Sequence, residues 1–442
     1  MIAENADFME CFADSVTFER SLLVAAAEWI ARAPALSMKM ELCRWVWSAA
    51  ARARRQSGML RSSAGLTTIE AKLDAGALCF IQTLAAAPSA DGFMFALRAL
   101  VAPAAAAMYG RLAARTSDEV ASAARDAAGF YRRIAQGRRK RRSFEHADAP
   151  YLRRVELLCE RIATCSYGEP LAIDPCERLP TAVTTPRRDH AIRALRPGEM
   201  QVENWMVSSD RDVEQYLHQM IGFELAAFEV VSRQIAEFPE MPWEFHQDMA
   251  TQIRDEVTHL RMWLARLPRC RGRLGRFPLS AFEFHVCSGS DLSARLALLQ
   301  RLIEGFGLEA LDLNRLLWDS RGDEDMVAYI ARLQMDEIVH VRQGNKWLRW
   351  LCGSEPALEA IADAAEISSR ERLLEAARVL EESGAVDPDN AELLRLKFDQ
   401  WWAFPLNAAL RRRAGFSQAE IRRERDRRPM PADDSIQSEE AP

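Results

Sequence analysis

The sequence predicts an all-α protein, and three observations support this. Alanine, leucine, arginine and glutamate, all good helix formers, dominate almost every segment of the 442 residues. Apolar residues recur at spacings of three and four over long stretches, which is the period of an amphipathic helix. Strand-like alternation is rare, and the β-rich piece at residues 282–286 is too short and isolated to build a sheet.

Prolines and glycines set the limits of the expected helices. In the second half of the chain, Pro239, Pro242 and Pro268 end or start helices, and Gly322 marks the last turn. Five prolines between residues 170 and 197 preclude a continuous helix there. The expected helices cover residues 15–32, 37–56, 67–87, 92–136 with an interruption near Pro103, 150–165, 203–238, 242–267, 290–319, 323–351, 355–364, 368–384 and 389–413.

The length of the chain suggests two domains joined by connecting segments. We expect an N-terminal helical domain at 1–142, a helix and proline-rich linker at 143–200, a four-helix bundle at 201–352, a C-terminal helical cap at 353–423 and a disordered tail at 424–442. Within the bundle, the first and third connections are short, whereas residues 268–289 are long enough to run back along it. Short, long and short connections are the ferritin-like connectivity.

Two Asp-Glu-x-x-His motifs carry the clearest chemical signal in the sequence. They are Asp255–His259, with the sequence DEVTH, and Asp336–His340, with the sequence DEIVH. Only these two of the seven histidines have a glutamate three residues earlier. Residues three apart project from the same face of a helix, so each motif offers a carboxylate and an imidazole to one point. A lone motif of this kind is usually a surface pair, but two matched motifs favour a metal site.

Each motif is preceded at nearly equal distance by a further glutamate. Glu224 lies 32 residues before the glutamate of the first motif, and Glu304 lies 33 residues before that of the second. One glutamate from each of two helices, with one Glu-x-x-His from each of two others, is the arrangement of di-iron and di-manganese carboxylate bundles. Glu229 and Glu309 compete on the same helices, but the matched spacing favours the first of each pair. The predicted metal ligands are Glu224, Glu256, His259, Glu304, Glu337 and His340.

The ligand set also indicates which metal and which neighbouring side chains to expect. Six oxygen and nitrogen ligands without a thiolate favour iron or manganese over structural zinc. Asp255 and Asp336, beside the motif glutamates, are candidate acceptors for the outward N–H of a ligand imidazole.

Tyr216 and Tyr329 each precede a ligand glutamate by eight residues and are candidates to approach the metals, although buried tyrosines more often pack in the core. The tryptophans of these helices, Trp263 among them, are interpreted as core filling.

Five segments of the second half share a pattern with known proteins: Ile221–Leu225, Asp255–His259, Ile303–Glu309, Asp336–Gly344 and Phe404–Phe416. Together they resemble an uncharacterised bacterial ferritin-like family, the domain of unknown function 455, over about residues 200–416. Gly222 departs from the pattern, in which histidine is expected. The resemblance implies a ferritin-like fold and a di-iron centre held by the six predicted ligands, and it implies no substrate.

The N-terminal domain looks like a degenerate relative of the same fold. The run Ser48–Ala53 lies where such helices elsewhere can carry an acidic-x-x-His element, and here alanines stand in place of ligands. The hypothesis is a duplicated architecture whose first half binds no metal. The oligomeric state stays open between a monomer and a homodimer.

Composition limits the surroundings in which the protein is expected. A net charge of −6 without a basic stripe gives no reason to expect nucleic acid as a partner. Early acidic residues oppose a secretory signal, and no run approaches the roughly 18 uncharged apolar residues of a membrane span. Nine cysteines are scattered without C-x-x-C or zinc-knuckle spacing, which is typical of free thiols in a reducing cytoplasm.

The expected function is that of a non-heme di-iron oxidase or oxygenase. Two iron ions, with manganese–iron as an alternative, and O2 as co-substrate would oxidise a small organic molecule, with electrons from an external donor. The alternatives are iron or peroxide handling, as in ferritins and rubrerythrins, and an interaction scaffold that metal only stabilises. The absence of a C-x-x-C electron-transfer pair argues against the former, and the intact ligand set argues against the latter. The acidic balance disfavours a tRNA-modifying hydroxylase.

Overall fold

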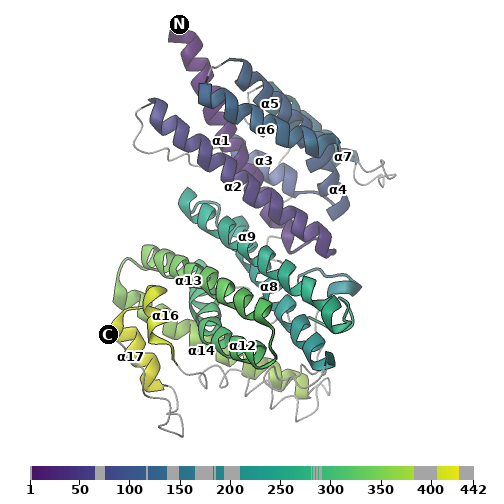
Figure 1. The fold of residues 1–442 in the computed structure, drawn as a ribbon. Helices are drawn as coiled ribbons and strands as arrows, with labels where there is room; N and C mark the ends of the chain where they lie inside the picture. Colours follow the sequence, from purple (N-terminus) through teal and green to yellow (C-terminus); the bar gives the residue numbers. More distant parts are fainter. Residues whose placement is uncertain are drawn as a thin grey trace. The chain divides into compact units, whose positions relative to one another are not determined.

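The computed structural model describes residues 2–64, 75–115, 118–136, 149–164, 183, 186–193, 210–279, 281, 284, 287, 291–382 and 406–427. Within these ranges the chain is helical and contains no β-strand, which confirms the all-α prediction (Figure 1). Five residues join α8 (Asp210–Glu237) to α9 (Trp243–Arg266), and three join α12 (Glu304–Ser320) to α13 (Glu324–Cys352). These short connections flank a long one, so the connectivity is compatible with a ferritin-like bundle.

Contacts divide the chain into two compact units. Unit 1 comprises Met1–Ile192 and Phe228–Thr258, and unit 2 comprises Arg193–Ala227 and His259–Pro442. The division falls inside the continuous helices α8 and α9, whereas the sequence places a domain boundary in the proline-rich linker. With a rise of about 1.5 Å per residue, the 28 residues of α8 span roughly 42 Å, which is long enough for one helix to contribute to two cores.

Unit 1 is built around two pairs of packed helices. Helix α1 (Ile2–Ile30) packs along α2 (Leu36–Ala64), and α5 (Ala102–Ala114) packs along α6 (Asp118–Gln136). The further elements are α3 (Ala75–Ala85), α4 (Ala90–Phe95), the π-helix η1 (Ala96–Val101), α7 (Ala149–Thr164) and the 3-10 turn η3 (His190–Ile192).

The predicted interruption of the fourth helix near Pro103 takes the form of a π-turn and not of a break in the chain of helical elements. Elements α4, η1 and α5 follow one another without a gap, so the helix runs from Ala90 to Ala114 and ends only before α6. In a regular α-helix, the proline ring would collide with the carbonyl group of the preceding turn. The wider π-turn before Pro103, in which the N–H of Ala102 bonds to the carbonyl of Leu97, makes room for the ring.

Two features bear on the expected surroundings of the protein. The stretch Ala90–Ala114 is long and apolar enough to cross a membrane by length and composition, although charged residues such as Arg98 and Arg111 interrupt its uncharged runs, and 67% of its apolar part is buried inside the protein. A helix buried in a protein core has the same length and composition, so these properties do not make Ala90–Ala114 a membrane span. The seven cysteines that fall in the described ranges are all free thiols.

A buried ion pair lies within unit 1. The Arg52 guanidinium donates to both carboxylate oxygens of Glu19, with distances of 2.7 Å from Nε to Oε1 and 2.9 Å from Nη2 to Oε2. The hydroxyls of Tyr109 and Tyr131 donate to the same carboxylate at 2.8 and 2.9 Å. Arg52 belongs to the alanine-rich run in which the sequence hypothesis places the missing ligands. In unit 1, therefore, a cation of the protein itself neutralises the buried glutamate.

Unit 2 holds the first part of α8, the end of α9 and the helices that follow. Helix α12 packs along α13, and α14 (Glu355–Glu382) packs against α13. The further elements are the 3-10 turn η4 (Leu267–Cys270), α11 (Leu292–Leu296), the π-helix η5 (Ala297–Ile303), α16 (Ala408–Arg413) and α17 (Gln418–Arg427).

The C-terminal helices differ from the prediction. Helix α14 is one helix instead of two, because no glycine or proline interrupts the sequence between residues 357 and 382. Most of the expected helix 389–413 lies outside the described residues. Its end, α16, is separated from α17 by a turn at Gly415, whose φ of +88° favours glycine. Helix α17 extends to Arg427, four residues into the range expected to be a disordered tail.

Replacing Arg52 by methionine should strongly destabilise unit 1. The variant leaves the Glu19 carboxylate, which is 0% exposed, without its cation, and breaking a buried ion pair in this way costs about 3–5 kcal/mol. The double variant Glu19→Gln/Arg52→Met carries neither charge and should recover most of the loss. Urea unfolding followed by circular dichroism measures both, and equal stability of the single and double variants would show that the two charges are not coupled.

His246 should make the stability of unit 1 depend on pH. Burial of its side chain, assisted by the charge of Arg20, lowers its pKa from 6.5 to about 3. Below pH 6.5 the unfolded chain binds a proton that the folded chain excludes, so the free energy of unfolding falls by up to about 1.4 kcal/mol per pH unit. His246→Gln should flatten this fall between pH 6.5 and 3, and an unchanged slope in urea titrations would contradict the assignment.

Candidate metal centre

Helices α8 and α9 carry three of the predicted ligands. Glu224 lies on α8 between the fully buried Ile221 and Leu225, whereas Glu256 and His259 lie one turn apart on α9. The exposed fractions of the three ligand residues are 8%, 1% and 1%. Glu256 is counted with unit 1, but the same unbroken helix carries it and His259, and the helical period directs both to one side.

Helices α12 and α13 carry the other three predicted ligands. Glu304 is the first residue of α12 and follows the π-helix η5 directly. Glu337 and His340 lie one turn apart on α13, as the first motif does on α9. All three side chains are buried, with exposed fractions of 8%, 8% and 0%.

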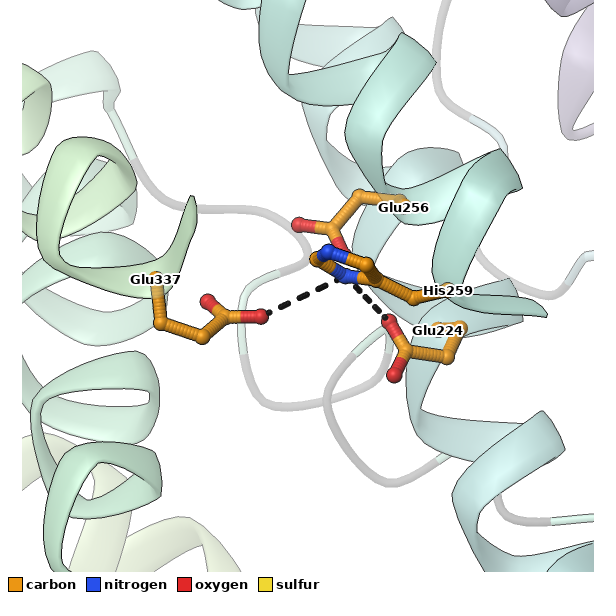
Figure 2. Close-up of side chains that lie close together, drawn as sticks. All are labelled: Glu224, Glu256, His259 and Glu337. Atoms are coloured by element: carbon orange, nitrogen blue, oxygen red, sulfur yellow. Dashed lines mark ion pairs between the residues drawn. The ribbon is translucent and has the colours of Figure 1, made fainter. Parts of the chain in front are cut away.

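The structure brings the six side chains together in two overlapping groups. In each group the candidate ligand atoms all lie within 4.8 Å of one another. One group is Glu224, Glu256, His259 and Glu337 (Figure 2), and the other is Glu256, Glu304, Glu337 and His340. The groups share two carboxylates, and each adds one glutamate and one histidine of its own. Each group could hold a metal ion, and Glu256 and Glu337 would serve both.

Both imidazoles turn Nδ1 toward the carboxylates. Nδ1 of His259 lies 3.4 Å from Glu224 Oε2 and 3.5 Å from Glu337 Oε1, and Nδ1 of His340 lies 3.1 Å from Glu337 Oε2. Ligand atoms about 2.1 Å from a metal ion are roughly 3 Å apart when they form a right angle at the ion. The spacing of the side chains therefore fits coordination through Nδ1.

Asp336 contacts the far side of a ligand imidazole. Its Oδ2 atom lies 3.3 Å from Nε2 of His259, and this hydrogen bond is the main reason that the pKa of Asp336 is lowered. A donor N–H at Nε2 leaves the lone pair at Nδ1, where the carboxylates converge. Asp255 accepts two hydrogen bonds from the Arg254 guanidinium, at 2.9 and 2.7 Å. Its role beside a ligand imidazole stays a prediction.

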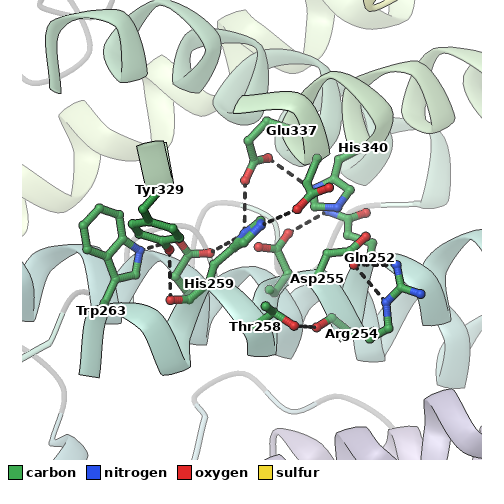
Figure 3. A network of polar contacts seen from close by, with 12 residues as sticks. Gln252, Arg254, Asp255, Thr258, His259, Trp263, Tyr329, Glu337 and His340 are labelled. Atoms are coloured by element: carbon green, nitrogen blue, oxygen red, sulfur yellow. Dashed lines mark hydrogen bonds and ion pairs between the residues drawn. The ribbon is translucent and has the colours of Figure 1, made fainter. Parts of the chain in front are cut away.

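Two further residues that the sequence analysis missed contact the ligands (Figure 3). Trp263 donates from Nε1 to Glu224 Oε1 at 2.8 Å, and Gln252 donates from Nε2 to Glu256 Oε1 at 3.2 Å. Trp263 follows His259 by four residues and Gln252 precedes Glu256 by four, so both lie on the ligand face of α9. That spacing was the available signal, but a tryptophan on an apolar face is also typical of a core.

The two candidate tyrosines lie beside the centre in different ways. The Tyr329 hydroxyl donates to the backbone carbonyl of His259 at 3.1 Å and so supports α9 (Figure 3). The Tyr216 ring lies edge-on to Trp263, and its centroid is 5.9 Å from that of Trp318. Burial raises the pKa of Tyr216, so its hydroxyl stays protonated. These contacts give both tyrosines a packing role next to the ligands.

Buried cations bind the two glutamates that competed with the predicted ligands. Lys39 Nζ and Arg188 Nη2 lie 2.9 and 2.8 Å from the carboxylate of Glu229. Arg411 donates to both oxygens of Glu309, at 2.9 and 2.7 Å. Both glutamates therefore have counter-ions from the protein, and neither belongs to the two groups of candidate ligands.

A π-helix precedes Glu304 directly. Element η5 covers Ala297–Ile303, and π-turns within helices occur frequently at functional sites. Gly344 of α13 packs against Gln300 in this π-helix. A Cβ atom added to Gly344 would lie 2.4 Å from the Cβ atom of Gln300, closer than real Cβ atoms come. The glycine thus permits the close packing that holds the π-turn next to the ligand.

The donor atoms and their burial fit metal ions. When ionised, the four ligand carboxylates carry four negative charges in a place that water hardly reaches. Such a cluster is very costly without compensating cations, and two divalent ions supply the same number of positive charges. Oxygen and nitrogen donors without sulfur suit iron or manganese. The cluster can therefore bind metal.

Fold and site together define the class: an all-helical protein with a buried carboxylate and histidine cluster able to hold metal ions. The chain belongs to the family described as "Protein of unknown function (DUF455)", which matches residues 154–422 and therefore more than half of the chain. The match extends beyond the segment at 200–416 that carries the resemblance in the sequence. No curated protein and no solved structure matches the chain.

Gly344→Ala should disturb the centre, whereas Gly307→Ala should not. The first variant forces Gln300 and the π-turn away from α13, and overpacking of this kind costs about 1–3 kcal/mol. The second adds a Cβ atom with nothing within 4 Å, so it should stabilise α12 by about 0.5–1 kcal/mol. Urea unfolding and the metal content per chain are measured for both. Wild-type metal binding in a destabilised Gly344→Ala protein would show that this packing does not orient Glu304.

Proposed function

We propose that the protein is a non-heme di-iron oxidase or oxygenase that uses O2 to oxidise a small organic molecule. The observation that carries the proposal is the pair of overlapping ligand groups, which share Glu256 and Glu337. A single structural ion needs one group, whereas two groups with shared carboxylates suit two adjacent ions. Two adjacent redox-active ions supply the capacity to bind O2 and to pass electrons between it and an organic substrate.

The residues of the chain bind and orient the ligand set. Glu256 and Glu337 would contribute to holding both ions, because they belong to both groups. Asp336 fixes the tautomer and the orientation of His259 through the bond to Nε2. Trp263 holds one oxygen of Glu224 by its N–H and leaves the second oxygen toward Nδ1 of His259. These contacts preorganise the centre before any substrate arrives.

Burial supports a small substrate. None of the six ligand residues is more than 8% exposed, so a macromolecule cannot bring its own atoms to the centre without a large opening. Oxygen and a small metabolite need much less space. Insertion of one oxygen atom into a substrate, with reduction of the other to water, consumes two electrons beyond those of the substrate. The proposal therefore includes an external electron donor.

The first experiment is to load the protein with ferrous iron without oxygen, measure iron per chain by plasma mass spectrometry and follow visible absorption on adding O2. About two irons per chain and a transient visible band are expected. Glu256→Ala and His340→Ala should lose iron while circular dichroism shows a folded protein, because each removes a member of the ligand groups. The surface variant Asp126→Asn, whose side chain is 68% exposed, is the matched control.

The outcomes separate the alternatives. Unchanged iron content in Glu256→Ala and His340→Ala would remove the ligand assignment. Two irons that oxidise quickly and leave the protein as ferric mineral would favour iron handling over oxidation of an organic substrate. Wild-type protein that takes up no iron would favour the scaffold interpretation.

A further inference from the structure

The C-terminal segment 406–427, here termed the brace, packs against two ligand-bearing helices of unit 2. It contains α16 and α17 and supplies none of the predicted ligands. Leu410 of the brace joins a buried apolar cluster with Leu308 of α12 and with Ile338 and Val341 of α13. Each of these three partners lies within about one helical turn of a ligand residue on the same helix. The brace therefore packs against α12 and α13 close to their ligand residues.

Helix α13 also holds the end of α16 by hydrogen bonds. Arg342, Asn345 and Arg349 donate to the backbone carbonyls of residues 413, 414 and 415, with distances between 2.6 and 3.0 Å. The last carbonyls of a helix have no partners within it, and here side chains of α13 supply them. The three donors lie on one face of α13, and they fix the brace along two turns of that helix.

Arg411 links the brace to α12, the helix of Glu304. Its side chain is 2% exposed and donates to both carboxylate oxygens of Glu309, at 2.9 and 2.7 Å. A Cβ atom added to Gly305 would lie 2.8 Å from Nη1 of Arg411. The glycine next to Glu304 thus lets the guanidinium lie directly against the ligand helix. The same guanidinium lies 5.6 Å from the ring centroid of Phe306.

A second buried arginine ties the other side of Glu304 to the brace. Arg301 belongs to the π-helix η5, three residues before the ligand, and forms an ion pair with Glu420 of α17. It also donates to the side chain of Asn345 on α13. Two arginine contacts therefore flank Glu304 along the chain. Arg301, before Glu304, contacts Glu420 of the brace. Arg411 of the brace contacts Glu309, after Glu304.

Glu309 makes this attachment relevant to the centre. It is a second buried carboxylate on the ligand helix, five residues after Glu304 and 2% exposed. Without its counter-ion, this carboxylate would be costly to bury and would attract a divalent ion. We propose that Arg411 is a positioning residue of the metal centre, which holds α12 so that Glu304 joins the ligand set and Glu309 does not. The inference rests on the proposed metal centre and extends it to a segment without ligands.

The test is a titration with Co(II), whose visible absorption bands report the ligand geometry around the ion. Arg411→Met should bind Co(II) about 10–100-fold more weakly with shifted bands, because loss of residues that orient ligands has effects of this size. Glu309→Gln/Arg411→Met removes the competing charge as well and should restore bands close to those of the wild type. Arg423→Gln, in the same segment, breaks an ion pair between side chains that are 44% and 29% exposed and should bind like the wild type.

Each outcome decides between a positioning role and simple packing. Wild-type bands and affinity in Arg411→Met, even with a lower melting temperature, would overturn the proposal. Shifted bands that persist in Glu309→Gln/Arg411→Met would also overturn the proposal, because they would show that Glu309 does not compete with Glu304 for the ion. If Arg411→Met does not fold, Arg411→Lys keeps the charge without the planar fork that holds both oxygens, and unchanged bands in this variant would also overturn the proposal. A wild-type protein that binds no Co(II) would instead count against the metal centre itself.

Discussion

The burial of four carboxylates in two overlapping groups is the constraint on which the second half of this protein depends. Glu224, Glu256, Glu304 and Glu337 come from four helices, and each is at most 8% exposed. Their mutual repulsion and lost hydration would oppose folding unless cations compensated them. Helices suit this task, because their regular period delivers a carboxylate and an imidazole from one turn and their own hydrogen bonds keep the backbone rigid. The neutral donors Trp263 and Gln252 orient two of the carboxylates without adding charge to the set.

Other buried glutamates of the chain are neutralised by basic side chains of the protein itself. Arg52 neutralises Glu19, Lys39 and Arg188 neutralise Glu229, and Arg411 neutralises Glu309. Each of these buried acids has a cation built into the fold, so none requires an ion from solution. The pair of Arg52 and Glu19 lies in unit 1, and Arg52 belongs to the run in which the sequence lacks ligands. That the first half is a duplicated bundle without metal stays a hypothesis.

Close contacts between helices set the direction of each ligand. Because Gly344 has no side chain, α13 packs closely against Gln300 of the π-helix that precedes Glu304. Because Gly305 has none, the guanidinium of Arg411 packs closely against α12. The brace at residues 406–427 packs against α12 and α13 together, so the two helices keep their relative register there. The six candidate ligands are thereby enclosed, each at most 8% exposed. The proposed oxidation of a small molecule by O2 is based on that enclosure and on the two carboxylates that the groups share.

The sequence by itself determined the helical fold, the order of the helices and the six members of the candidate site, because these depend on local period and on spacing along the chain. The relation of Glu256 to His259, or of Glu337 to His340, is set within one helical turn and can be predicted without a structure. Contacts between helices depend on packing across long sequence separations, which no local pattern reveals. Only the tertiary structure showed that Trp263 bonds to Glu224 and that Pro103 is accommodated by a π-turn. It also decided that Glu229 and Glu309 are bound by cations 190 and 102 residues away in the sequence, because those distances are closed only when the chain folds.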